Sequence, residues 1–391
     1  MGGGLMQLVA YGAQDIYLTG NPQITFFKVV YRRHTNFAME AIEQTWDGNA
    51  LGTGASRCTA TISRNGDLVG RMYLEIDGTP DVSPGPSPPL KTQANLNAAS
   101  ITSIKIEIGG QQVDKHSGQW LNVWSLLTEP NPNGHVGECD GTDKKGTQFQ
   151  NMSGLGGSLA VTVGAMKTFV PLQFWFCRNP GLALPLIALQ YHEVKIILEH
   201  TFSGGYTSVT SNKLWCEYIF LDTDERRRFA QVSHEYLIEQ LQEQSITPGT
   251  NSYLYFNHPV KELIFTVDAT AGQLTAIGSG SDTYQLKLNG NDRFAARDWR
   301  YFTRTQIWQY HSGGGGLLSA ARTQGKFNDS IGVYSFALKP EEHQPSGTCN
   351  FSRIDNAQLI VSSGANANRI YAVNYNVLRI MSGMGGLAYS N

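Results

Sequence analysis

One ten-residue pattern occurs in both halves of this chain, and it constrains the possible folds more than any other feature. Residues 176–185 and 336–345 both follow the pattern Phe-x-x-x-Pro-x-x-x-x-Pro, and both lead into an apolar segment. A second pair, IEIGGQQ from Ile106 and LKLNGND from Leu286, occurs in the same order and closes on a Gly-centred turn. Two matches in one order predict two copies of one fold, with loop insertions explaining their unequal spacing.

Each copy contains short stretches rich in β-branched and aromatic residues, bounded by Gly, Pro, Asn, Asp or Ser. This pattern is typical of a β-sandwich or barrel and not of alternating strands and helices. A helix is expected from Asp222, where Asp222 and Glu225 have the spacing of a helix cap. The segment HEYLIEQLQ, from His234, fits a helix and a strand equally well. The expected strands begin at Ile24, Cys58, Ile104, Val194, Leu214, Lys261, Tyr284, Val333, Ala357 and Arg369.

The chain has 391 residues, enough for two domains of ordinary size. The helix-like segment from Asp222 to Thr247 interrupts the strands, so we expect the boundary there. Residues 1–222 would comprise an N-terminal arm and the first copy, and residues 223–391 a linker segment and the second copy. The 30 Lys and Arg residues against 32 Asp and Glu give a net charge of −2, which cannot neutralise many phosphates. The composition therefore argues against direct nucleic-acid binding.

The cysteines and the apolar segments indicate in which cellular compartment the chain would fold. The five cysteines are scattered without a Cys-x-x-Cys spacing, so we expect buried, reduced thiols. The chain opens without the charged and apolar regions of a signal peptide, and no run of about 18 apolar residues occurs, which predicts neither secretion nor a membrane span. The cysteines are Cys58, Cys139, Cys177, Cys216 and Cys349.

A search for catalytic motifs predicts no enzyme, cofactor or metal site. The sequence contains no phosphate-binding GxxxxGK[ST] motif and no G-x-S-x-G elbow. None of the nine histidines has the i, i+4 partner of a helical zinc site. The acidic residues Asp222, Asp224 and Glu225 precede residues 226–228, all arginine, and predict a local ion-pair network at the domain joint rather than an acid/base pair.

Two further patterns leave alternatives open. Basic and aromatic residues interleave between Phe26 and Phe37, which would suit single-stranded nucleic acid but fits a sandwich strand as well. Sequons for N-glycosylation occur at Asn151, Asn328 and Asn350, although a chain without a signal peptide would not meet the secretory pathway.

Long segments resemble one protein family from end to end. The run LVAYGAQDIYLTGNPQITFFKVVYRRHTNF, Leu8 to Phe37, closely resembles the opening of the major capsid proteins of nucleocytoplasmic large DNA viruses, especially those infecting algae. Further similar segments are SRNGDL (63–68), IEIGGQQVDKH (106–116), PGLALPLIALQYHEVK (180–195), YIFLDTDERRRFAQVSHEYLIEQLQ (218–242), LNGNDRF (288–294), SFALKPEEHQPSGTCNFSRIDNA (335–357) and NYNVLRIMSGMGGLAYSN (374–391).

This resemblance implies an all-β fold of two consecutive eight-stranded antiparallel jelly rolls with few short helices. It also implies a homotrimer with a pseudo-sixfold outline, and an icosahedral shell of such capsomers around a lipid membrane and double-stranded DNA. The N-terminal arm, about Gly2 to Asn21, would lie at the capsomer base and contact neighbours or minor capsid proteins. The protein would be found in the virion, after assembly in the host cytoplasm.

The sequence departs from the family in one respect and leaves two other functions open. Several members carry long tower loops in the second jelly roll, whereas only the segments 266–284 and 311–330 are available here. The chain would therefore also suit a paralogue at special capsid positions. The alternative from another class is a carbohydrate-binding module, with Trp46 or Tyr206 as an exposed platform. Trp120, Trp124 and Trp175 lie in apolar runs and are expected in the core.

Overall fold

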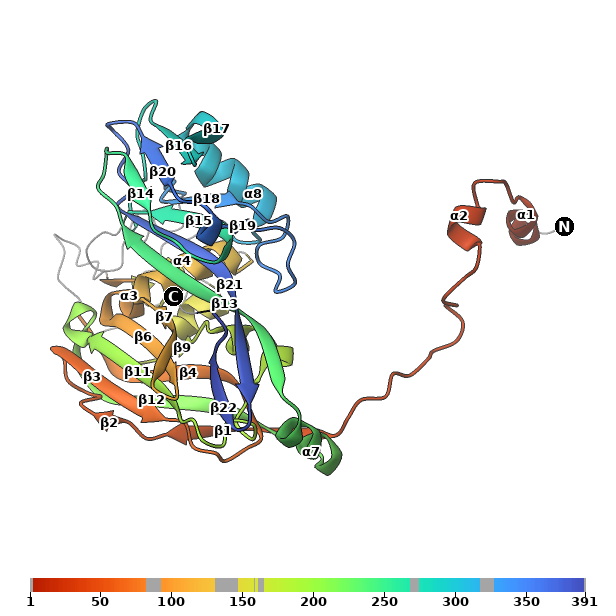
Figure 1. The fold of residues 1–391 in the computed structure, drawn as a ribbon, viewed down its shortest axis with the longest axis horizontal. Coiled ribbons are helices and arrows are strands. Elements are labelled where there is room, and N and C mark those ends of the chain that lie inside the picture. Colours follow the sequence, from red (N-terminus) through yellow and green to blue (C-terminus); the bar gives the residue numbers. More distant parts are fainter. Residues whose placement is uncertain are drawn as a thin grey trace. The chain divides into compact units, whose positions relative to one another are not determined.

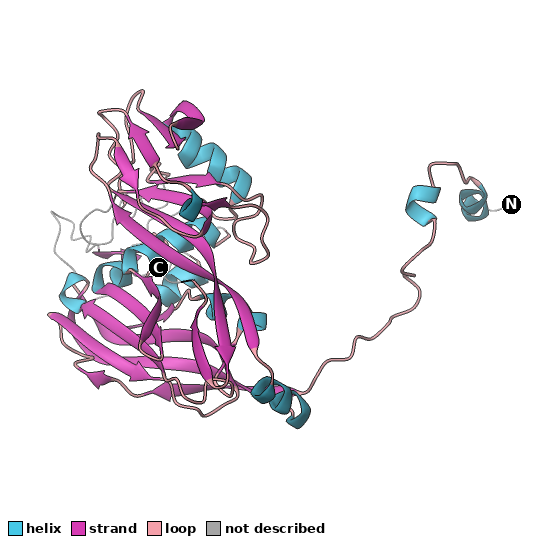
Figure 2. Ribbon diagram, viewed as in Figure 1, coloured by secondary structure: helices cyan, strands magenta, loops and turns pink. Residues whose placement is uncertain are grey.

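A computed structural model describes residues 3–81, 93–130, 147–157, 159–160, 165–267, 274–316 and 327–389. It divides into two compact units, Met1–Asn36 and Phe37–Asn391. Strands dominate the larger unit, and all of its strand pairs are antiparallel (Figure 2).

The first half of the larger unit, here called the first roll, contains two five-stranded sheets and a small sheet of β5 (Gln93–Ala94) and β8 (Leu159–Ala160). Both five-stranded sheets alternate buried and exposed side chains, because one face of each packs on the core between them. One sheet contains, in spatial order, β1 (Phe37–Gln44), β12 (Tyr206–Leu221), β4 (Leu68–Pro80) and then β9 (Met166–Pro171) and β10 (Leu184–Pro185), which both pair with β4. The other contains β2 (Asp47–Gly48), β3 (Ala55–Thr61), β11 (Val194–Thr201), β6 (Ile101–Ile108) and β7 (Gln111–His116).

The second half, the second roll, repeats this arrangement (Figure 1). Its first sheet contains β13 (His234–Ser245), β21 (Arg369–Met381), β15 (Pro259–Thr266) and β18 (Ile331–Ser335), with β19 (Cys349–Asn350) on β15 and β22 (Met384–Leu387) on β21. Its second sheet contains β14 (Ser252–Leu254), β20 (Ala357–Val361), β16 (Thr283–Leu288) and β17 (Asn291–Asp298).

The duplication expected from the sequence is confirmed strand by strand. Eight main strands of each roll follow the same order along the chain and in space, which is the topology of two jelly rolls. The two IEIGGQQ-like segments form the equivalent hairpins β6–β7 and β16–β17, and each turn contains a glycine with positive φ, Gly110 and Gly290. The two Phe-x-x-x-Pro segments also occupy equivalent connections, between β9 and β10 and between β18 and β19.

Short helices fill the connections. The helix expected from Asp222 is α7 (Thr223–Gln231), and the Asp222 carboxylate accepts a hydrogen bond of 2.7 Å from the backbone N–H of Thr223. The ambiguous HEYLIEQLQ segment is strand, in β13. Within the described ranges of the larger unit, the other helices are α3 (Leu96–Ser100), α4 (Gly118–Thr128), α5 (Gln148–Ser153), α6 (Trp175–Arg178) and α8 (Gln306–Tyr310). A π-helical turn (Tyr301–Thr305) continues into α8, and 3-10 turns occur at Pro180–Leu182, Phe202–Gly204 and Phe351–Arg353.

Two expectations for the first half are wrong. Residues 24–36 form no strand, and the first strand begins only at Phe37. Among the described residues of the unit Met1–Asn36, which are 3–36, the elements are α1 (Gly3–Val9) and α2 (Ile16–Thr19), neither with a buried residue, and this part of the chain contains no strand with which residues 24–31 could pair. The local ion-pair network is also wrong, because Arg226 pairs instead with Asp67 in the loop before β4, at 2.7 Å.

Three large apolar clusters form most of the core, and a small fourth one contains Leu68, Ala183 and Ile219. One lies between the sheets of the first roll, one between those of the second, and a third joins α4 to the second roll. Trp120, Trp124 and Trp175 are buried in these clusters, as expected. Cys58, Cys177 and Cys216 are buried free thiols, and burial raises the pKa of Cys58 and of Cys177 to about 12. Cys139 lies outside the described residues.

Candidate assembly surfaces

Helix α4 is the main apolar contact between the two rolls. It is buried on all sides, and its N-terminus is capped by Ser117, whose hydroxyl accepts a hydrogen bond from the backbone N–H of Trp120 at 3.1 Å. Leu121 points into the core of the first roll. Trp120, Val123, Trp124 and Leu127 point the other way, onto the second roll.

Backbone hydrogen bonds fix the position of α4 against the second roll. The N–H groups of Gly313 and Gly315 donate to the carbonyl oxygens of Leu127 and Leu126, at 2.7 and 3.0 Å. A Cβ atom on Gly313 would lie 2.4 Å from the carbonyl oxygen of Leu126, so only glycine permits this approach. The last carbonyl groups of a helix have no hydrogen-bond donors within the helix. At the end of α4, the second roll supplies these donors.

The C-terminal strands extend the joint along the first roll (Figure 1). Leu378 and Ile380 of β21 belong to the apolar core of the first roll. The backbone N–H of Tyr191 donates to the carbonyl of Gly383 at 2.9 Å, and the Nδ1 atom of His192 lies 2.8 Å from the carbonyl oxygen of Gly385. These contacts leave the two rolls little freedom to hinge.

Glu239 is the centre of a buried charge cluster at the joint. Its carboxylate lies 2.7 Å from the Nζ atom of Lys261, which is only 1% exposed, and 2.9 Å from the guanidinium of Arg178 on α6 of the other roll. Burial raises the pKa of Glu239, but the charges of Arg178 and Lys261 and a hydrogen bond from His343 outweigh it and hold that pKa at about 2. Burial lowers the pKa of Lys261.

His311 forms a second buried cluster, immediately after α8. Its Nε2 atom lies 2.9 Å from Glu262 and its Nδ1 atom 3.0 Å from Glu341. Burial lowers the pKa of His311, but the two carboxylates outweigh it and raise that pKa to about 9. Ser312 continues the cluster to the first roll, because its hydroxyl oxygen lies 2.8 Å from the Glu341 carboxylate and 2.9 Å from the carbonyl oxygen of Thr128, within donating distance of either. With α4 and the glycine contacts, these clusters make the two rolls one rigid unit.

The first roll has an aromatic surface that the second roll does not cover. It lies on the outer face of the sheet formed by β1, β12, β4 and β9. Tyr73 stacks on Trp215 with ring centroids 6.4 Å apart and meets the edge of Phe169 at 6.1 Å. The indole N–H of Trp215 donates to Glu75 at 2.7 Å.

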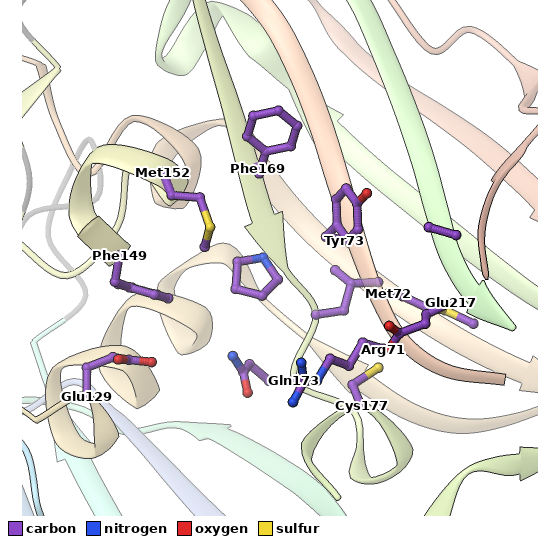
Figure 3. A pocket seen from close by; sticks show the side chains of 13 residues that line it. Arg71, Met72, Tyr73, Glu129, Phe149, Met152, Phe169, Gln173, Cys177 and Glu217 are labelled. Carbon is purple, nitrogen blue, oxygen red and sulfur yellow. The ribbon is translucent and has the colours of Figure 1, made fainter. Parts of the chain in front are cut away.

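A cavity of about 550 Å³ opens beside these rings. In Figure 3, Phe149 and Met152 of α5 approach from one side, and Tyr73 and Met72 of the sheet from the other. Carboxylates of Glu129 and Glu217 and the guanidinium of Arg71 lie among the lining side chains, so the cavity is apolar with a charged rim.

The second roll exposes a helical face at its own equivalent of α4. Trp308 on α8 is 81% exposed, and Arg304 and Thr305 in the preceding π-helical turn are exposed as well. The adjoining strand β17 is exposed along almost its whole length, whereas its counterpart β7 is half buried at the joint. Large apolar side chains on the surface of a soluble protein indicate an interaction site.

The unit Met1–Asn36 exposes a row of large apolar side chains. Phe26 and Phe27 are 87% and 98% exposed, and Tyr17, Leu18 and Tyr31 are nearly as open. A stretch this apolar is suited to burial against a partner.

The structure places the other candidate residues as follows. Tyr206 is 1% exposed and donates to Asn97, so the expected carbohydrate platform is wrong there; Trp46 is only half exposed. The amide of Asn328 donates to Leu274 in a half-buried position, while Asn151 and Asn350 are exposed. Glycosylation at all three stays a prediction.

The described residues contain neither a cluster of metal-ligating side chains nor a helix that could span a membrane. Within the described ranges, His, Cys, Asp and Glu side chains nowhere gather in groups of three that could hold a metal ion. Among the helices of those same ranges, none has the length and apolar character needed to cross a bilayer.

Sequence reasoning missed the residues of the joint and of the exposed helical face. Glu239 and Lys261 were unremarkable charges in strand-like runs, and their partner Arg178 lies in the other roll. Trp308 could have been found, because it follows the second Gly-centred hairpin as Trp120 and Trp124 follow the first. Its neighbours Arg304 and Gln309 distinguish it from a core tryptophan.

Comparison with known proteins gives consistent results over the whole chain. Residues 25–222 match the family described as the major capsid protein N-terminus, and residues 225–386 match the family described as the large eukaryotic DNA virus major capsid protein. The major capsid proteins of Pyramimonas orientalis virus and Phaeocystis pouchetii virus are 51% and 40% identical to this chain, and each alignment covers all of both proteins.

A solved structure agrees with these relatives. The quasi-atomic model of the PBCV-1 virus capsid contains a chain that is 35% identical and superposes with a TM-score of 0.76. The superposition covers 94% of this chain and 100% of the other.

Proposed function

Because the chain belongs to the major capsid protein family of large eukaryotic DNA viruses, we propose that three copies form a capsomer with a pseudo-sixfold outline and that such capsomers tile an icosahedral shell. The observation that supports this most directly is the rigid joint between two equivalent rolls. Three such pairs in a ring give six similar wedges, so a threefold object can pack hexagonally.

The composition suits a structural role. A net charge of −2 lets like subunits meet without strong mutual repulsion, and it does not favour direct contact with the genome. We propose that the protein is not an enzyme, that it assembles in the host cytoplasm, and that an internal viral membrane lies under the shell. We also propose that residues 1–222 and 223–391 are the two domains.

Light scattering on purified protein tests the trimer. At micromolar concentration we expect a species with three times the chain mass of 43.0 kDa. A species that keeps the mass of one chain across this concentration range would contradict the pre-formed capsomer. Localisation of the chain in a cryo-electron map of the particle would then distinguish a principal subunit from a paralogue at special positions.

We propose a separate role for the unit Met1–Asn36, which includes the N-terminal arm expected at about Gly2 to Asn21. Its exposed rings and aliphatic side chains would become buried when it orders against neighbouring capsomers or minor capsid proteins under the shell. Contacts of this kind would link capsomers to one another, whereas the larger unit, Phe37–Asn391, would form the trimer.

Deletion of residues 1–36 tests this division of roles. Since α1 and α2 contain no buried residue, we expect the truncated chain to melt within about 2 °C of the full chain and to remain trimeric. We expect it to lose assembly into shells when it replaces the full chain in infected or expressing cells. Scanning calorimetry and electron microscopy provide the two measurements. Normal shells from the truncated chain would contradict the proposed role of residues 1–36.

A further inference from the structure

The outer face of the first sheet in the second roll shows how one roll receives its neighbour. Six side chains on this face form the floor on which α4 packs, and Trp120 of α4 lies 5.1 Å from the Tyr371 ring, centroid to centroid. These six residues, from strands β13, β15, β18 and β21, are Leu241, Ile264, Ile331, Val333, Tyr371 and Val373.

Strand register identifies the equivalent residues of the first roll. In the first roll Cys216 pairs with Met72, and in the second roll Ala372 pairs with Leu263; both pairs lie in the core of their roll. We take these two pairs as equivalent and count along the paired strands from them to match the neighbouring residues. The counterparts of the six floor residues, in the same order, are Ala41, Tyr73, Phe169, Pro171, Trp215 and Glu217. All but Trp215 line the 550 Å³ cavity, and Trp215 stacks on Tyr73. The cavity therefore occupies the place where α4 packs in the second roll.

The helical segment after β17 has the counterpart of the α4 face. Leu121 of α4 and Phe302 each point into the core of their own roll, which aligns the two segments. The four α4 residues that contact the second roll, Trp120, Val123, Trp124 and Leu127, then correspond to Tyr301, Arg304, Thr305 and Trp308. Both sets have the sequence spacing i, i+3, i+4, i+7, and Arg304, Thr305 and Trp308 are exposed while Tyr301 is half-buried. The π-helical turn at 301–305 widens this segment locally relative to α4.

Figure 1 shows β7 and α4 between the two rolls, and β17 at the end of the second roll away from the first. In a threefold ring of tandem rolls, that end faces the first roll of the next copy. The contact made once inside the chain would then be repeated between chains.

We propose that the exposed face of residues 301–308 docks on the first roll of a neighbouring copy, with Trp308 inserted into the cavity beside Tyr73 and Phe169. The inference rests on the proposed trimer and names the surfaces that would hold it together. Aromatic and arginine side chains in a pocket are the residues that dominate the energy of such interfaces.

The charges of the two surfaces are compatible with this contact. Within the joint, Val123 and Val373 belong to one apolar cluster. At the proposed interface their counterparts are Glu217 and Arg304, whose guanidinium also pairs with Asp329 of its own chain at 2.7 Å, so a basic side chain would lie near an acidic one. Glu129 adds a second carboxylate to the cavity rim, and Arg71 also lies there. Interfaces between chains are richer in such charge pairs at their edges than domain cores are.

Photo-crosslinking tests the contact directly. The photoreactive amino acid p-benzoylphenylalanine would be placed at position 308, and in a control chain at position 255. Tyr255 is 78% exposed and follows β14, at the opposite edge of the same sheet from β17. We expect covalent dimers only from position 308, with mass spectrometry placing the linkage on residues 41, 71–73, 147–157 or 165–177 of the other copy.

Substitution provides an independent measurement. Trp308→Ala removes an exposed side chain, so the monomer should fold normally, whereas we expect the concentration at which the trimer dissociates to rise about tenfold or more. Tyr255→Ala should leave that concentration unchanged. A trimer that forms normally with Trp308→Ala, or crosslinks from position 308 to other surfaces, would overturn this interface and leave the proposed trimer intact. A wild-type chain that stays monomeric would overturn both.

Discussion

Substitution of Glu239 by glutamine is expected to lower the free energy of unfolding by about 3–5 kcal/mol, because it leaves the buried ammonium of Lys261 without a counter-charge. Glutamine has nearly the same volume as glutamate, so the change tests charge rather than packing. Arg178 also loses its partner, which weakens the attachment of α6 to the second roll. Urea unfolding followed by tryptophan fluorescence measures the loss.

Glu235 on the same strand provides a matched control. It pairs with Arg379 at 2.7 Å, but both side chains are more than half exposed, so Glu235→Gln should change the free energy of unfolding by less than about 1 kcal/mol. A double variant, Glu239→Leu with Lys261→Met, should recover much of the loss, since apolar side chains of similar size often replace a buried pair without penalty. An equally small effect of Glu239→Gln and Glu235→Gln would contradict the central role of Glu239.

The repeated fold was predictable because the duplication preserves local patterns. The Gly-centred hairpins and the Phe-x-x-x-Pro segments lie in equivalent connections, since turn geometry depends on a few neighbouring residues. The burial of Trp120 and Trp124 was predictable for the same reason. What could not be read was the difference between the copies: α4 is buried by the other roll, while α8 exposes Trp308.

Long-range pairing explains the remaining failures. Residues 24–31 have the composition of a strand, but a strand needs a partner, and the sequence does not show whether one exists within the chain. Arg226 follows three acidic residues yet pairs with Asp67, 159 residues away. Arg178 and Glu239 likewise meet only because the two rolls pack together. Such contacts depend on tertiary structure and leave no local signal.

The second large effect expected at the joint is a loss of stability above neutral pH, caused by His311. The folded pKa of His311 is about 9, above its ordinary value of 6.5. The imidazolium therefore stabilises the fold fully below about pH 6.5, and this contribution disappears as the pH rises through 9. A shift of this size corresponds to about 3 kcal/mol. Urea unfolding at pH 6, 7.5, 9 and 10 should follow this decline.

A double variant, His311→Gln with Glu262→Gln, isolates the effect. It removes the imidazole and also the carboxylate that would otherwise be left buried and unpaired, so neither position titrates. The contribution of His311 is the decrease in the free energy of unfolding of the wild type between pH 6.5 and 9.5, minus the same decrease in the variant. Lys261, whose pKa is lowered by burial, titrates with the opposite sign. Because Glu262 raises that pKa in the wild type, the Lys261 contribution does not cancel fully, and the difference is an upper limit on the effect of His311. Burial raises the pKa of Cys58, Cys177 and Tyr236 to about 12, so these groups also cost stability at the alkaline end of this range, where the unfolded thiols ionise. They are the same in both chains, and the subtraction removes this loss.

The same titration connects the joint to the proposed interface. Loss of the imidazolium leaves Glu262 and Glu341 facing each other across a neutral ring, next to Ser312 and its hydrogen bond to the end of α4. If the joint sets the angle between the rolls, alkaline pH should weaken the trimer as well as the fold, and the double variant should lack this additional sensitivity. Light scattering at pH 7 and 9.5 measures it. Equal pH dependence in the wild type and the double variant would show that His311 does not hold the joint in its charged form.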